Sequence, residues 1–184
     1  MHRPIVVLLL ASAVLLPALI AAEARDGEPL APRQQAMKDM AAAAKAVAGM
    51  FGGTLAYDRA AFRQAASVFA SHSGPALVAL FDGPAPTNSS ADDAKIAAER
   101  HAFDEIALRL GEVAAAFEKK AEGAGATLTP DMRMGSGIPM GGGSLLGAKP
   151  LASETDLETI PAEHLFHMML ETCTGCHAKF RRRR

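Results

Sequence analysis

The stretch Cys173-Thr174-Gly175-Cys176-His177 decides how the rest of the chain is interpreted, because it contains the only two cysteines among 184 residues. A C-x-x-C-H run is the attachment signature of a c-type haem. Residues three and four apart share one face of a helix, so both thiols can add to the porphyrin vinyl groups while His177 offers an imidazole nitrogen to the iron. The motif therefore predicts one covalently attached haem c per chain, with His177 as the metal ligand.

A bare C-x-x-C pair has two other uses, as a redox dithiol and as half of a zinc site. The dithiol is disfavoured because the strand–helix pattern expected upstream of such a motif is missing. A zinc site needs more ligands than one Cys-Cys-His cluster provides. Haem attachment is therefore the favoured interpretation.

Residues 1–24 have the composition of a secretory signal peptide. A basic start is followed by an apolar run over residues 5–22 and by the small-x-small end Ala22-Glu23-Ala24. A membrane anchor is the alternative, but Pro17 interrupts the run. We expect cleavage after the triplet, a mature domain of residues 25–184 in the periplasm, and membrane contact only through an uncleaved signal. Haem c is attached outside the cytoplasm, so export and motif agree.

The composition favours a single helical domain. The formal net charge is −1 and 21% of the residues are charged, so nothing indicates a nucleic-acid partner. Alanine-rich stretches with few β-branched residues favour helix over strand. Tryptophan is absent, and a bound porphyrin could supply the missing large flat apolar group. No catalytic triad, phosphate loop or paired acid–base set is present, so we do not expect an enzyme.

Apolar periodicity and mostly short connections predict an all-α protein, an antiparallel four-helix bundle. The motif adds a covalently bound haem near the C-terminal helix. We expect Asp58 to cap the second helix and residues 76–81 to form a short apolar turn. The helices are expected over residues 31–50, 59–71 and 91–122, and from residue 161 into the haem motif.

Residues 123–158 interrupt this pattern with a Gly-, Pro- and Met-rich insertion that has no helical period, so we expect a long loop. Soft thioethers select Cu(I), and Met132, Met134 and Met140 therefore raise an alternative, a copper-handling role for residues 123–153. The simpler interpretation is a loop with a few apolar anchors.

Three places in the sequence resemble the cytochrome c prime family, the class II cytochromes c. Residues 33–40, RQQAMKDM, are similar to that family's opening Arg-Gln-x-x-(Leu/Met)-x-x-(Met/Leu). Tyr57-Asp58 and Leu80-Phe81-Asp82-Gly83 resemble its turns on either side of the second helix. The haem motif followed by Ala178-Lys179-Phe180-Arg181 resembles its close. Two features depart from the family: Ala97 stands where a tryptophan is common, and the insertion replaces a short turn.

The resemblance implies a role for several residues. Arg33 and Gln34 would approach the haem propionates, and Arg181 would lie near His177. Met37 would sit over the distal face of the iron. The resemblance also implies a haem protein that binds small gases or carries electrons, and a homodimer is compatible with it.

Met37 decides between two mechanisms, because it lies one turn after Arg33 on the inward stripe of the first helix. If its thioether bonds the iron, the protein is a low-spin His/Met electron carrier. If it only packs over the iron, the site is five-coordinate and has room for a diatomic gas. An apolar distal pocket offers no hydrogen bond to oxygen, so NO and CO would be favoured. The sequence does not identify a redox partner protein.

Overall fold

Helices make up most of the described chain. The computed structural model describes residues 32–83, 85, 89–135 and 157–182, so the expected signal peptide lies outside the described residues. The elements are α1 (Pro32–Phe51), α2 (Arg59–His72), α3 (Pro75–Ala79), α4 (Asp93–Ala98), α5 (Arg100–Glu122), the 3-10 turn η1 (Pro130–Met132) and α7 (Ala162–Phe180). The only β-type pairing among the described residues is one isolated bridge between Ala91 and Arg181. The expected all-α class is confirmed.

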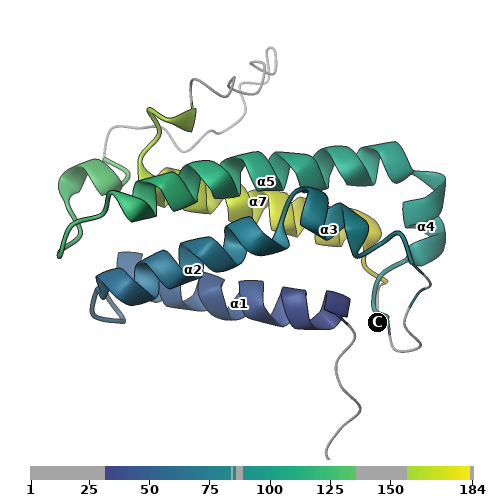
Figure 1. Cartoon of the computed structure of the whole chain (residues 1–184), viewed down its shortest axis with the longest axis horizontal. Helices are drawn as coiled ribbons and strands as arrows, with labels where there is room; N and C mark the ends of the chain where they lie inside the picture. Colours follow the sequence, from purple (N-terminus) through teal and green to yellow (C-terminus); the bar gives the residue numbers. More distant parts are fainter. Residues whose placement is uncertain (1–31, 84, 86–88, 136–156, 183–184) are drawn as a thin grey trace, which may run out of the picture.

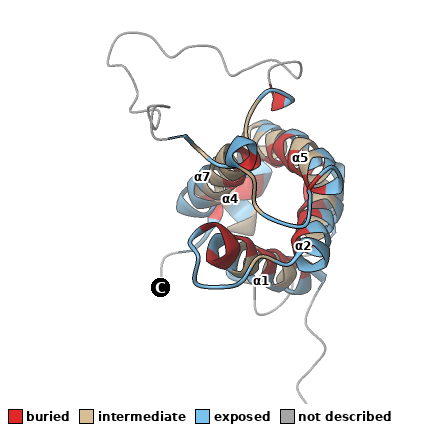
Figure 2. Cartoon of the chain, turned by 90° about the vertical axis from the view of Figure 1, so that its left-hand side faces the viewer, coloured by how far each residue is buried: buried red, intermediate tan, exposed pale blue. Residues whose placement is uncertain are grey.

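The four long helices α1, α2, α5 and α7 run in alternating directions and form the expected bundle (Figure 1). The closest packing joins α1 to α2, α2 to α5, and α5 to α7, whereas α1 and α7 approach each other much less closely. Seen from one end, the helices turn their buried residues toward a common interior (Figure 2). The side between α1 and α7 is therefore the least closed side of the bundle. In the described part of the chain, no helix is both long and apolar enough to cross a membrane.

Aromatic rings fill the interior at the end of the bundle where α1 ends and α7 begins. Phe62 of α2 lies edge-on to Phe117 of α5, with 5.3 Å between ring centroids. Phe51 of α1 lies 6.2 Å from Phe166 of α7. Burying a large apolar side chain contributes about 1.5–3 kcal/mol, so these contacts hold the first and last helices together at this end.

A second, smaller apolar cluster lies at the opposite end of the bundle. It consists of Ile96 of α4, Phe103 of α5 and Phe180 of α7, all of them buried. The rings of Phe103 and Phe180 meet edge-on at 5.6 Å, and Phe81 packs against Phe103 at 4.8 Å. This cluster fixes the C-terminal end of α7, which carries the haem motif.

The single helix expected over residues 91–122 is wrong, because the chain leaves helical geometry at Glu99 (φ −118°, ψ 38°). The Asp92 side chain caps α4 by accepting a hydrogen bond from Lys95 N at 3.1 Å. The break allows α4 to fold across the end of α7, where Ile96 joins Phe180. Periodicity does not reveal it, because Ile96 and Phe103 are seven residues apart and keep the helical spacing across the break.

The expected cap of α2 is confirmed, whereas the segment after α2 differs from the expectation. Asp58 is the predicted cap of α2: its Oδ1 accepts a hydrogen bond from Ala61 N at 2.7 Å. Of the expected short apolar turn over residues 76–81, residues 76–79 belong instead to the short helix α3, which begins at Pro75. Proline is favoured in the first turn of a helix because its fixed φ suits that position and no N–H is needed there.

The insertion is not wholly a free loop. Its first part, residues 123–135, packs on the bundle, and Met132 is only 7% exposed in the main core. Arg133 donates a hydrogen bond to Phe51 O at 2.8 Å, and Met134 N donates one to the Glu163 carboxylate at 2.7 Å. Residues 136–156, including Met140, lie outside the described residues.

Two glycines allow the α2–α3 turn to touch α5. Gly74 has φ +61°, and its backbone N donates to Ala107 O at 3.0 Å. A Cβ built at Gly111 would lie 2.6 Å from Gly74 Cα and 2.9 Å from Gly74 N. Backbone atoms cannot move aside as a side chain can, so the close approach requires glycine at position 111.

Gly111→Ala should therefore lower the free energy of unfolding in urea by about 1–3 kcal/mol, the usual range for overpacking. In a helix interior without such a contact, replacing glycine by alanine stabilises the helix by up to about 1 kcal/mol. A loss of stability in Gly111→Ala would therefore indicate the backbone contact. Gly123→Ala, whose added Cβ would make only ordinary contacts at 3.7 Å or more, is the matched control and should be near neutral. A Gly111→Ala protein as stable as wild type would contradict the backbone contact.

Candidate cofactor site

A cavity of about 380 Å³ is lined by α1 on one side and α7 on the other, at the end of the bundle that carries α3 and α4. Its apolar surface comes from both ends of the chain and from the segments between them, chiefly Met37, Leu77, Phe81, Ile96, Phe103 and Phe180. Volumes of this order, with mostly apolar walls and a few polar groups, are typical of cofactor sites.

The cavity brings together most of the residues expected at the site. Six of the seven predicted residues line it, and they come from α1 and from α7 and the residue that follows it: Arg33, Gln34, Met37, Cys176, His177 and Arg181. The seventh, Cys173, is half-buried on α7 and packs against the main core. Residues about 140 positions apart in sequence are thus adjacent in space, because the antiparallel bundle places the start of α1 beside the end of α7.

Both cysteines are free thiols in partly apolar surroundings. Burial raises the pKa of Cys173. Burial, with a smaller contribution from the neighbouring Cys173, raises the pKa of Cys176 to about 11. Catalytic dithiols need a lowered thiol pKa to form the thiolate at neutral pH. These thiols stay protonated, which argues against the redox-dithiol alternative.

His177 follows Cys176 on α7 and also lines the cavity. Partial burial lowers the pKa of its imidazole, and the positive charge of Arg181 lowers it further. The ring is therefore neutral at pH 7, which leaves a nitrogen lone pair for a metal. Among the described residues, no group of three or more His, Cys, Asp or Glu is placed to hold a metal ion, so the zinc alternative gains no support.

Arg33 lines the cavity as expected, but its guanidinium is held by the protein. Nε donates to Leu80 O at 2.5 Å, and one terminal nitrogen donates to Gly83 O at 3.1 Å. The other terminal nitrogen forms an ion pair with Asp93 at 2.5 Å. The guanidinium also stacks over the Phe81 ring at 4.2 Å. Arg33 thus joins α1 to α3 and α4, and its charge is neutralised where it stands.

Asp93, the ion-pair partner of Arg33, and Lys38, which lines the cavity, are residues that sequence reasoning missed. Asp93 lies in the first turn of α4, where an aspartate is ordinarily explained by the helix dipole. Its partner Arg33 is 60 positions earlier in the chain, so no local pattern indicates the pair. The second carboxylate oxygen of Asp93 is buried without a hydrogen-bond partner.

The residues of the cavity fit a haem. The apolar walls suit the faces of a porphyrin, and His177 and Cys176 line the cavity from α7. The second thiol, Cys173, lies one turn earlier on the same helix. The polar residues that line the cavity carry positive or no charge, and none is an acid. Such a lining suits a cofactor that carries carboxylates. Cys173 and Cys176 would hold the haem through thioethers, and His177 would ligate the iron.

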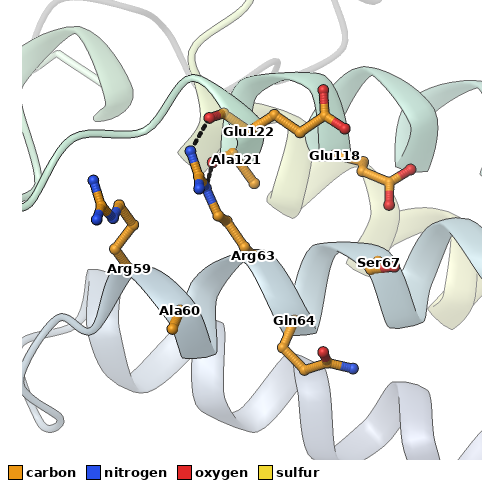
Figure 3. A pocket seen from close by; sticks show the side chains of 8 residues that line it. All are labelled: Arg59, Ala60, Arg63, Gln64, Ser67, Glu118, Ala121 and Glu122. Carbon is orange, nitrogen blue, oxygen red and sulfur yellow. Dashed lines mark hydrogen bonds between the residues drawn. The ribbon is translucent and has the colours of Figure 1, made fainter.

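A larger surface groove of about 590 Å³ lies elsewhere, between α2 and the end of α5. Arg63 crosses from α2 and donates to the Ala121 and Glu122 carbonyls at the C-terminus of α5 (Figure 3). A cation at that position satisfies carbonyls that have no partner in the helix. The lining of the groove contains no His, Cys or Met, so it offers a haem iron none of its usual protein ligands.

Comparison with known proteins identifies the family. The family model described as cytochrome C' matches residues 28–133, which is more than half of the chain. A search of solved structures finds "Cytochrome c prime from Shewanella frigidimarina", with a TM-score of 0.54 and 18% sequence identity, covering 82% of this chain and 91% of that one. At this identity the likeness shows the fold alone. Comparison with curated proteins gave no match.

The fold is a helical bundle, and the family match places the chain among the c-type cytochromes. The chain belongs to the cytochrome c prime family. Members of this family are haem proteins, and membership implies covalently bound haem c. The matched stretch ends before α7 begins, so the family match and the Cys173–His177 motif are independent observations that agree.

The Arg33–Asp93 pair can be tested by a double-mutant cycle. Arg33→Gln or Asp93→Asn alone should lower the free energy of unfolding by about 1.5–3 kcal/mol, because each leaves a charged partner unmatched. The double variant should be less destabilised than the sum of the two. The exposed pair Lys119–Glu158 is the control and should show a smaller coupling. Additive effects at Arg33 and Asp93 would contradict the pairing.

Proposed function

We propose that this protein is an exported c-type haem protein with one haem per chain and a five-coordinate iron, which binds NO or CO, carries electrons, or does both. The observation that carries the proposal is the shared cavity. His177 and Cys176 face it from α7, and Met37 faces it from α1. Export to the periplasm rests on the composition of residues 1–24.

When bound, haem supplies a redox-active iron with a coordination position that a gas can occupy. The chain's own residues do the rest. Cys173 and Cys176 would hold the cofactor on α7, and the neutral imidazole of His177 would ligate the iron. The apolar side chains around the cavity exclude water, which favours small uncharged ligands.

Met37 supports the five-coordinate proposal because it is part of the packing of α1. Its side chain is half-buried and lies against the main core. Moving a packed side chain toward an iron costs contacts. A packed thioether also offers no hydrogen bond to bound oxygen, so selectivity should favour NO and CO. The low-spin His/Met electron carrier is the alternative.

The copper alternative receives no support from the described residues. Met132 is buried in the main core, where its thioether acts as an apolar anchor. The backbone of Met134 is tied to Glu163 by a hydrogen bond. We therefore propose no copper site.

Covalent attachment can be tested directly. The holoprotein, made in a host with haem-attachment machinery, should keep its colour after denaturation and show the mass of one haem. Both properties should be lost in the Cys173→Ala/Cys176→Ala variant. A colourless mature wild-type protein would refute the proposal.

The role of Met37 is tested by ligand binding. Ferrous wild-type protein should be high-spin and should bind CO slowly, because the packed side chain must move aside. Met37→Ala should bind CO faster without a change of spin state, as measured by optical spectroscopy and flash photolysis. A low-spin wild type that becomes high-spin in Met37→Ala would instead show ligation and favour electron transfer.

A further inference from the structure

The cavity is lined by basic side chains to which the proposed function assigns no role. Three basic side chains line it, Arg33, Lys38 and Arg181, and no acidic side chain does. A haem carries two carboxylates, and a carboxylate taken partly out of water needs a partner. The resemblance to the family suggested Arg33 and Gln34 for this task. The contacts of the three cations indicate a different residue.

Arg33 is not available as a free counter-charge. Asp93 neutralises it at 2.5 Å, and Leu80 O and Gly83 O accept two more of its hydrogen bonds. A propionate placed beside Arg33 would also lie near the Asp93 carboxylate and be repelled by it. The pair therefore acts mainly as a clamp between α1, α3 and α4.

Arg181 is placed at the attachment side of the site. It follows α7, its backbone pairs with Ala91, and its backbone N donates a hydrogen bond to His177 O at 3.1 Å. In haem the vinyl substituents and the propionates are on opposite edges of the ring. A propionate partner should therefore come from an element other than α7.

A propionate partner thus needs a charge that is not already neutralised and a position on an element other than α7. Lys38 meets both conditions. It lies on α1, on the opposite side of the cavity from α7, one helical turn after Gln34. Its side chain is exposed, and in the described part of the chain it forms no ion pair. A lysine ammonium is a mobile point charge that can reach a carboxylate without a fixed geometry.

We propose that Lys38, and not Arg33, supplies the counter-charge for a haem propionate. This inference rests on the proposed function, because it requires that haem occupies the cavity. Asp93 keeps Arg33 out of the interaction. The electrostatic effect of the protein on the iron then depends more on an exposed lysine than on the buried arginine.

The test compares Lys38→Gln with Lys45→Gln in the holoprotein. Lys45 is the matched control, because it is an exposed lysine on the same helix, two turns further on, and does not line the cavity. Removing a nearby cation favours the more positive ferric iron. Lys38→Gln should shift the ferric–ferrous equilibrium constant by about threefold to tenfold toward ferric at low salt, where tenfold is 59 mV for one electron. Lys45→Gln should shift this equilibrium constant by less than about twofold. Lys38→Arg keeps the positive charge and should have the wild-type value.

Direct contact is distinguished from a general field effect by resonance Raman spectroscopy. The propionate bending band should move in Lys38→Gln and stay in place in Lys45→Gln. The neutral pair Arg33→Gln/Asp93→Asn should leave that band unchanged. A coloured Lys38→Gln protein with an unchanged band and potential would overturn the inference and leave the proposed function intact. A colourless wild-type protein would overturn both.

Discussion

The unequal contact between α1 and α7 is the constraint on which the site depends. At one end of the bundle Phe51 and Phe166 bring the two helices together, with 6.2 Å between their rings. At the other end Arg33 joins α1 to α3 and α4 through Leu80 and Asp93, and α7 is held by Phe180 in the second cluster. At this end the first and last helices are therefore held through α4 and the residues around it rather than against each other, and a cavity lies between them.

The residues that would bind the haem are uncharged, and the charged residues near the cavity are different ones. The residues that would hold the haem are two thiols kept protonated by burial and one neutral imidazole. The strongest charge pair nearby, Arg33 with Asp93, is internally compensated. The cavity itself is lined mostly by apolar side chains.

Much of the fold can be predicted from the sequence, because the signals involved are local. Asp58 caps α2 as its position indicates, and the α1 stripe from Arg33 to Phe51 gives the length of the first helix. The motif on α7 and Met37 on α1 could be matched to one site because the resemblance placed both near the haem. The cap of α2 and the extent of α1 depend on residues close together in the sequence, which is why they can be predicted from it.

The parts that sequence reasoning missed depend on long-range contacts. The break at Glu99 is invisible to periodicity, since Ile96 and Phe103 keep their spacing across it. The pairing of Arg33 with Asp93 joins elements 60 positions apart, and it changes the expected role of the arginine. Met132 agrees with the interpretation of the insertion as a loop with apolar anchors, but which of its methionines reaches the core depends on contacts that the sequence does not show.

The central claim is that the cavity between α1 and α7 is the haem site, and a crystal structure of the purified holoprotein tests it most directly. The account predicts a haem bonded to Cys173 and Cys176, lying between the two helices, with His177 on one face and Met37 on the other. A haem bound on the outer surface of α7, with α1 closed against α7 and the cavity absent, would contradict it.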